Sequence, residues 1–139
     1  MEITSEQVRQ KIRKNWPMMA LILLTDPVYY MPKFKDLKEF IRDDLGNERE
    51  FVDNLYACEE FSLSFLVALR QKRADDYLNN KLTNTMNWAV GLVFTQSHSK
   101  LHYQNIAITE DQGVLLIEPQ ADKILHAGMV SLEAHYVFM

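Results

Sequence analysis

The stretch from Leu101 to Gln120 reads LHYQNIAITEDQGVLLIEPQ and predicts a β-hairpin. Two runs with the apolar character of strands flank TEDQG, which is a signal for a tight hairpin. An odd number of loop residues would place Gln104 opposite Glu118 and Gln120 opposite His102. In that register His102 and Glu118 are diagonal neighbours on one face, within reach of a hydrogen bond. A two-residue loop would instead turn His102 to the other face.

Further strands are predicted on both sides of this hairpin, by WAVGLVFTQ at 88–96 and by LEAHYVFM at 132–139. Helices are predicted before them. TSEQ at 4–7 resembles a capping box, an apolar stripe follows in KFKDLKEFIRDDLG at 33–46, and a second stripe begins at Phe61. Because the helices precede an antiparallel sheet, we expect the α+β class, with N-terminal helices packed on a C-terminal sheet.

The composition indicates one domain, because 139 residues and 16.3 kDa suffice for one hydrophobic core. We expect a single domain over 1–139, with a helical N-terminal layer at 1–50. The Cys58 helix and the antiparallel sheet would occupy 51–139.

The net charge and the N-terminal sequence limit the classes of partner that we expect. A net charge of −4 argues against nucleic acid as a partner. Residues 1–7, MEITSEQ, lack the features of a signal peptide, and the longest apolar run, MMALILL, is too short to span a membrane. We therefore expect a cytoplasmic protein without a membrane partner, present as a monomer or a small homo-oligomer.

Cys58 is the one cysteine of the chain and lies in YACEEF at 56–61. A single thiol leaves three interpretations: a buried side chain, a lone metal ligand or a nucleophile. Unsatisfied N–H groups at the start of a helix favour a thiolate, whereas Glu59 and Glu60 oppose it. A nucleophilic role would also need a histidine, and His102 is the candidate that has a carboxylate, Glu118, as its predicted neighbour.

The segments YACEEFSLSFLVAL, WAVGLVF, HYQNIAI and VLLIEPQ resemble papain-like cysteine peptidases and their NlpC/P60-like relatives. They are most similar to the papain-like domain at the C-terminus of a fungal agglutinin and to small phage and bacterial proteins. The resemblance implies a papain-like core with Cys58 as nucleophile, His102 as base and Glu118 as its orienting acid. Supporting roles would fall to Gln120, Asp53 and Asn54, the last two as candidate oxyanion donors.

The implied function is a cysteine hydrolase that cleaves an amide bond in a peptide, an isopeptide or a peptidoglycan-like crosslink, with no cofactor and no metal. The alternative is a non-catalytic binding or structural protein of phage or mobile-element origin on the same fold. A metal-binding protein is a further alternative, because His98 and His102 are spaced like a ligand pair on a helix. Their setting, however, favours a turn that enters a strand.

Overall fold

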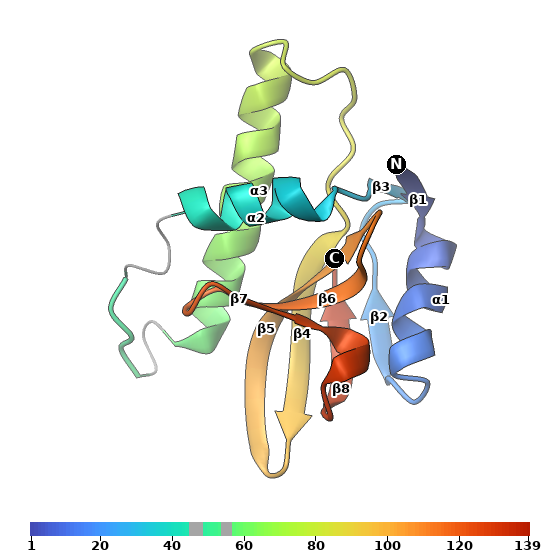
Figure 1. Cartoon of the computed structure of the whole chain (residues 1–139), viewed down its shortest axis with the longest axis vertical. Helices are drawn as coiled ribbons and strands as arrows, with labels where there is room; N and C mark the ends of the chain where they lie inside the picture. Colours follow the sequence, from blue (N-terminus) through green and yellow to red (C-terminus); the bar gives the residue numbers. More distant parts are fainter. Residues whose placement is uncertain (45–48, 54–56) are drawn as a thin grey trace.

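The computed structural model describes residues 1–44, 49–53 and 57–139, whose helices pack against strands of two sheets (Figure 1). The described elements are β1 (Glu2–Thr4), α1 (Ser5–Asn15), β2 (Leu21–Leu23), β3 (Val28–Tyr30), α2 (Phe34–Asp43), α3 (Cys58–Leu78), β4 (Val90–Ser97), β5 (Lys100–Thr109), β6 (Gly113–Glu118), β7 (Lys123–His126), the 3-10 helix η2 (Ala127–Met129) and β8 (Glu133–Phe138). The expected α+β character is confirmed at this level, because helices and a mostly antiparallel sheet make up the chain.

The central sheet has six strands in the order β2-β8-β4-β5-β6-β7, and β1 pairs with β3 in a small separate sheet. Every neighbouring pair in the central sheet is antiparallel except β2 and β8, which run parallel. In the β5–β6 hairpin, Asn105 pairs with Ile117 and Thr109 with Gly113, so the loop contains the three residues 110–112. The expected odd loop and its register are thereby confirmed.

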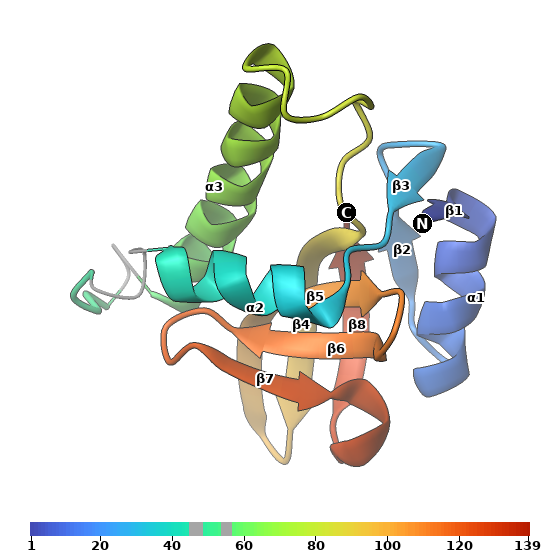
Figure 2. The ribbon, with the colours of Figure 1, turned by 45° about the horizontal axis from the view of Figure 1, so that its top comes forward.

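Each face of the central sheet carries its own hydrophobic core. We call the face with Val93, Ile106, Leu116 and Val137 the α1 face, because these side chains pack in one cluster with Val8 and Ile12 of α1. The α3 face contributes Val90, Ala107, Leu115 and Ile117, which pack with Leu37 and Phe40 of α2 and with Phe65, Leu66 and Leu69 of α3. In Figure 2, α1 lies beside β2, away from α2 and α3.

The first helix begins as its sequence predicts. The Thr4 hydroxyl accepts a hydrogen bond from the Gln7 N–H at 3.2 Å, and the Gln7 side chain accepts one from the Thr4 N–H at 3.0 Å. This reciprocal pair satisfies two N–H groups that the first turn of a helix leaves without partners. Val8 and Ile12 then follow one turn apart and are fully buried.

Two features of the chain differ from the expectation. The segment 1–50 is not a helical layer, because it also supplies β1, β2 and β3, and β2 joins the central sheet at its edge. Strand β7 and η2 follow β6 without a clear strand or helix pattern in the sequence. Among the described residues, no helix combines the length and the apolar run that crossing a membrane requires.

Candidate functional site

The structure brings His102 and Glu118 together. His102 Nε2 and Glu118 Oε2 form a hydrogen bond between β5 and the end of β6, with the two side chains 28% and 20% exposed. The pair follows from the hairpin register, which places both side chains on one face. The contact therefore depends on the three-residue loop at 110–112, which is one of the odd lengths that the hairpin sequence allowed.

Cys58 lies at the start of α3, the helix that packs against the α3 face of the central sheet. Glu60 Oε2 accepts a hydrogen bond from the Ala57 N–H at 2.9 Å, so this carboxylate caps the helix. Asn105 on β5 donates from Nδ2 to the Ser62 carbonyl of α3 at 3.0 Å, which fixes Asn105 on the α3 face. Because side chains alternate along a strand, His102 projects from the α1 face. The structure thus joins His102 to Glu118 and places Cys58 on the other side of the sheet.

The supporting residues expected from the sequence are spread over the surface. Gln120 is exposed in the turn between β6 and β7 rather than paired on a strand. Asp53 is exposed in the segment before α3, and Asn54 lies outside the described residues. Catalytic and supporting roles for all these residues stay predictions.

An aromatic cluster occupies the α3 face near the first turn of α3. Phe94, Tyr103 and Tyr136 come from three neighbouring strands, and their ring centroids lie 4.9–6.2 Å apart. The phenolic groups of Tyr103 and Tyr136 share a hydrogen bond. This bond is the main cause that raises the pKa of Tyr103 to about 12, with burial and the nearby charges of Glu59 and Cys58 contributing less. Cys58 therefore lies close enough to Tyr103, on the α3 face, to influence its pKa.

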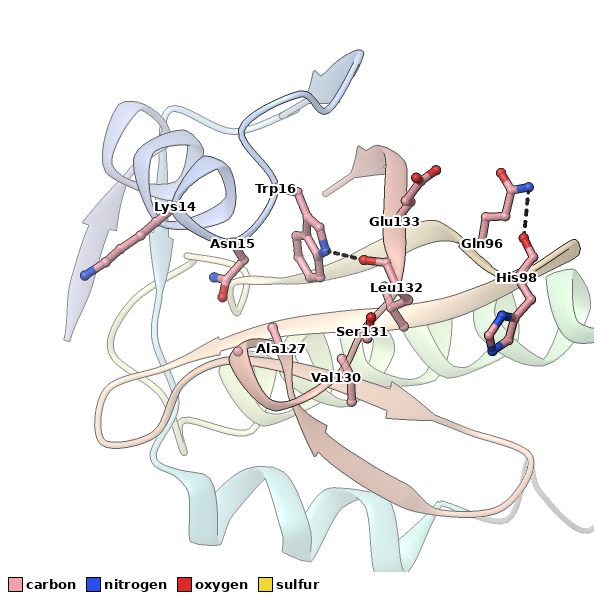
Figure 3. Close-up of a pocket in the computed structure, with 11 residues that line it drawn as sticks. Lys14, Asn15, Trp16, Gln96, His98, Ala127, Val130, Ser131, Leu132 and Glu133 are labelled. Carbon is pink, nitrogen blue, oxygen red and sulfur yellow. Dashed lines mark hydrogen bonds between the residues drawn. The ribbon is translucent and has the colours of Figure 1, made fainter.

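A polar cleft of about 680 Å³ lies elsewhere, where the end of α1, the β4–β5 turn and the segment before β8 meet (Figure 3). Its volume falls within the range of small-molecule sites. The residues that line it are Lys14, Asn15, Trp16, Gln96, His98, Ala127, Gly128, Val130, Ser131, Leu132 and Glu133.

Hydrogen bonds hold the cleft walls in place. Trp16 Nε1 donates to the Leu132 carbonyl at 3.2 Å and ties the end of α1 to the segment before β8. Gln96 Nε2 donates to the His98 carbonyl at 3.4 Å, across a two-residue turn in which His98 has a φ of 55°. Glu133 supplies the carboxylate of the described lining. The other polar groups include the amides of Asn15 and Gln96, the Ser131 hydroxyl, the His98 imidazole and the Lys14 ammonium. The cleft is thus richer in hydrogen-bond donors than in anions.

Sequence reasoning did not find this cleft, because its walls come from segments far apart in the chain and no local motif marks them. His98 entered the sequence argument only as a metal candidate. Among the described residues, no three His, Cys, Asp or Glu side chains are grouped so that they could hold a metal ion.

No family model and no curated protein matches this chain. Several solved structures are similar in fold, and two of them are each 16% identical in sequence to this chain. One, described as "PSL1a-E64 complex", has a TM-score of 0.81, and the other, a Polyporus squamosus lectin bound to the epitope Neu5Aca2-6Galb1-4GlcNAc, has a TM-score of 0.77. Each match covers 98% of this chain and 49% of the other, so this chain spans about half the length of either neighbour.

These neighbours correct the functional expectation from the sequence. They are structures of a lectin, a carbohydrate-binding protein, and not of a papain-like peptidase. The resemblance to papain-like peptidases is therefore wrong as an identification, and so are the hydrolase activity and the peptide or peptidoglycan-like substrate drawn from it. The alternative of a non-catalytic binding function agrees better with the comparisons. At 16% identity, the likeness itself extends to the fold alone.

Proposed function

We propose that this chain is a non-catalytic binding domain whose ligand occupies the polar cleft between α1, the β4–β5 turn and the segment before β8. The observation that carries the proposal is the cleft itself, about 680 Å³ in volume and lined mainly by hydrogen-bond donors. Walls that are tied together before a ligand arrives reduce the entropy that is lost on binding. The Trp16–Leu132 hydrogen bond is such a tie.

The chemistry of the lining selects the class of ligand. Lys14 and His98 offer positive or donor groups, while Asn15 and Ser131 offer groups that both donate and accept. A ligand with several hydroxyl groups and one carboxylate complements this set. Sialylated glycans have that chemistry, and the glycan bound by the Polyporus squamosus lectin supplies the first probe.

The test is a titration of isotope-labelled protein with Neu5Aca2-6Galb1-4GlcNAc, followed through the backbone amide signals. We expect saturable shifts at Gln96, His98 and Ser131. Lys14→Met should weaken binding by about tenfold, because it removes the charge that would meet the ligand's carboxylate. Lys11→Met is the matched control, since it removes the same charge one turn earlier on α1 and outside this cleft.

Three results would contradict the proposal. The first is an absence of shifts at millimolar glycan, and the second is an equal loss of affinity in the Lys11→Met and Lys14→Met variants. The third comes from E64, which is named with the other structural neighbour. If E64 binds and shifts signals around Cys58 and Tyr103 while the glycan shifts none, the binding site lies at the start of α3 and not in the cleft.

A further inference from the structure

A second cavity, which we call the basic groove, lies between the last turns of α1, the β5–β6 loop and η2. It has a volume of about 670 Å³. The residues that line it are Lys11, Lys14, Asn15, Gln112, Gly113, Val114, His126, Gly128 and Met129. Lys14, Asn15 and Gly128 also line the polar cleft, so the two cavities adjoin at these residues. In Figure 3, Lys14 lies at the opposite end of the cleft from His98.

Helix α1 concentrates positive charge on one side of the basic groove. Its basic residues are Arg9, Lys11, Arg13 and Lys14, against the single acidic residue Glu6, whereas the whole chain has a net charge of −4. Lys11 and Lys14 are three residues apart and therefore project from the same side of the helix. Both are exposed, and neither forms an ion pair with a carboxylate in the part of the chain that the structure describes. Their charges are thus available to an anion in the basic groove.

The remaining groups of the lining suit a sugar that carries this anion. The described lining of the basic groove includes no carboxylate, and Lys ammonium groups bind phosphate-like oxyanions as point charges. Asn15 and Gln112 supply amides, which both donate hydrogen bonds to hydroxyl groups and accept them. Val114 and Met129 supply apolar surface for the C–H groups of a sugar ring.

Gly128 occupies the junction of the basic groove and the polar cleft. A Cβ built at this position would lie 3.8 Å from Asn15 Oδ1, which is an ordinary van der Waals distance. Alanine therefore fits at position 128, whereas a large side chain there would enter the space beside Asn15 that the two cavities share.

We infer that the basic groove binds a sugar that carries an oxyanion ester, sulfate or phosphate, whose oxygens accept hydrogen bonds from the ammonium groups of Lys11 and Lys14. This inference goes beyond the proposed function, because it concerns a second anionic group and a second cavity. Since the cavities adjoin at Gly128, one oligosaccharide can occupy both.

Glucose 6-sulfate and glucose 6-phosphate are the probes, titrated into isotope-labelled protein and followed through the backbone amide signals. We expect saturable shifts at Gln112, Gly113 and Gly128 with at least one ester, and the ester that binds more tightly identifies the oxyanion. Glucose, inorganic sulfate and inorganic phosphate should each bind much more weakly, because each lacks one part of the ligand. Lys11→Met should weaken ester binding by about fivefold, since it removes one exposed charge.

Three further variants separate the site from general charge effects. Lys35→Met removes the same exposed charge from α2, outside the basic groove, and should leave ester affinity unchanged. Gly128→Phe should abolish the ester-induced shifts while both lysines remain, and Gly128→Ala should bind like the wild type. Lys11, Lys35 and Gly128 are exposed, so these variants should unfold at the temperature of the wild type.

The inference is overturned if glucose or the inorganic anions bind as tightly as the esters, or if Lys35→Met costs as much affinity as Lys11→Met. It is also overturned if Gly128→Phe binds the esters like the wild type, or if neither ester gives saturable shifts at millimolar concentration. Lys11→Met should leave the affinity for Neu5Aca2-6Galb1-4GlcNAc unchanged, and the esters are tested without that glycan. The two proposals therefore succeed or fail separately.

Discussion

Replacing Asn105 by alanine tests how the sheet and α3 are joined. Asn105 is fully buried, and its Nδ2 donates to the Ser62 carbonyl of α3 at 3.0 Å and to the Gly91 carbonyl of β4 at 3.1 Å. Each buried hydrogen bond of this kind contributes about 1 kcal/mol, and the two carbonyls would lose this donor. We therefore expect Asn105→Ala to lower the free energy of unfolding by about 2–3 kcal/mol.

Urea unfolding followed by tryptophan fluorescence measures this change. For a domain of this size, the expected loss corresponds to a fall in Tm of about 6–10 °C. Ser62→Ala is the control, because the Ser62 hydroxyl is buried and has no hydrogen-bond partner among the described residues, so its removal should cost no stability. If Asn105→Ala lost less than about 0.5 kcal/mol, or if Ser62→Ala lost as much, the Asn105 amide would not be what fastens α3 to the sheet.

Three further predictions follow from other contacts. In Gly91→Ala the new Cβ would lie 2.2 Å from the Phe138 carbonyl oxygen, so β8 must move, and urea unfolding should show a loss of at least about 3 kcal/mol; a loss below about 1 kcal/mol would mean that the strands adjust freely. Because the pKa of Tyr103 is raised from 10.0 to about 12, its contribution to stability is complete below pH 10 and is lost as the pH rises toward 12. Tyr103→Phe should remove this part of the pH dependence of Tm. In an ultraviolet titration, the variant should show one tyrosine fewer that ionises above pH 10 than the wild type does; a midpoint of 10.0 for Tyr103 in the wild type would contradict the shared hydrogen bond. His102→Ala should leave the pH dependence of iodoacetamide alkylation of Cys58 unchanged, because His102 projects from the opposite face; a transition moved to higher pH would show that His102 acts on the thiol.

Local signals in the sequence were sufficient where the structure depends on neighbouring residues. The reciprocal Thr4–Gln7 cap could be predicted because a capping box uses side chains three residues apart. The His102–Glu118 contact could be predicted because a short odd loop determines which residues of a hairpin face one another. In both cases the partners are close in sequence, so few alternative arrangements compete.

The position of α3 on the sheet and the walls of the polar cleft could be known only from the tertiary structure. The pattern around Cys58 predicts a helix, but the pattern does not say which face of the sheet this helix covers. The packing of Phe65, Leu66 and Leu69 against Ala107 and Leu115 places α3 on the face opposite His102. Burial of apolar area is not directional, so periodicity alone does not say which face a helix covers. The polar cleft likewise joins segments that only the folded chain brings together. Local patterns were therefore enough for the three helices, the β5–β6 hairpin and the strands beside it, whereas β1, β2, β3 and β7 and the chemical groups that share a surface depended on long-range packing.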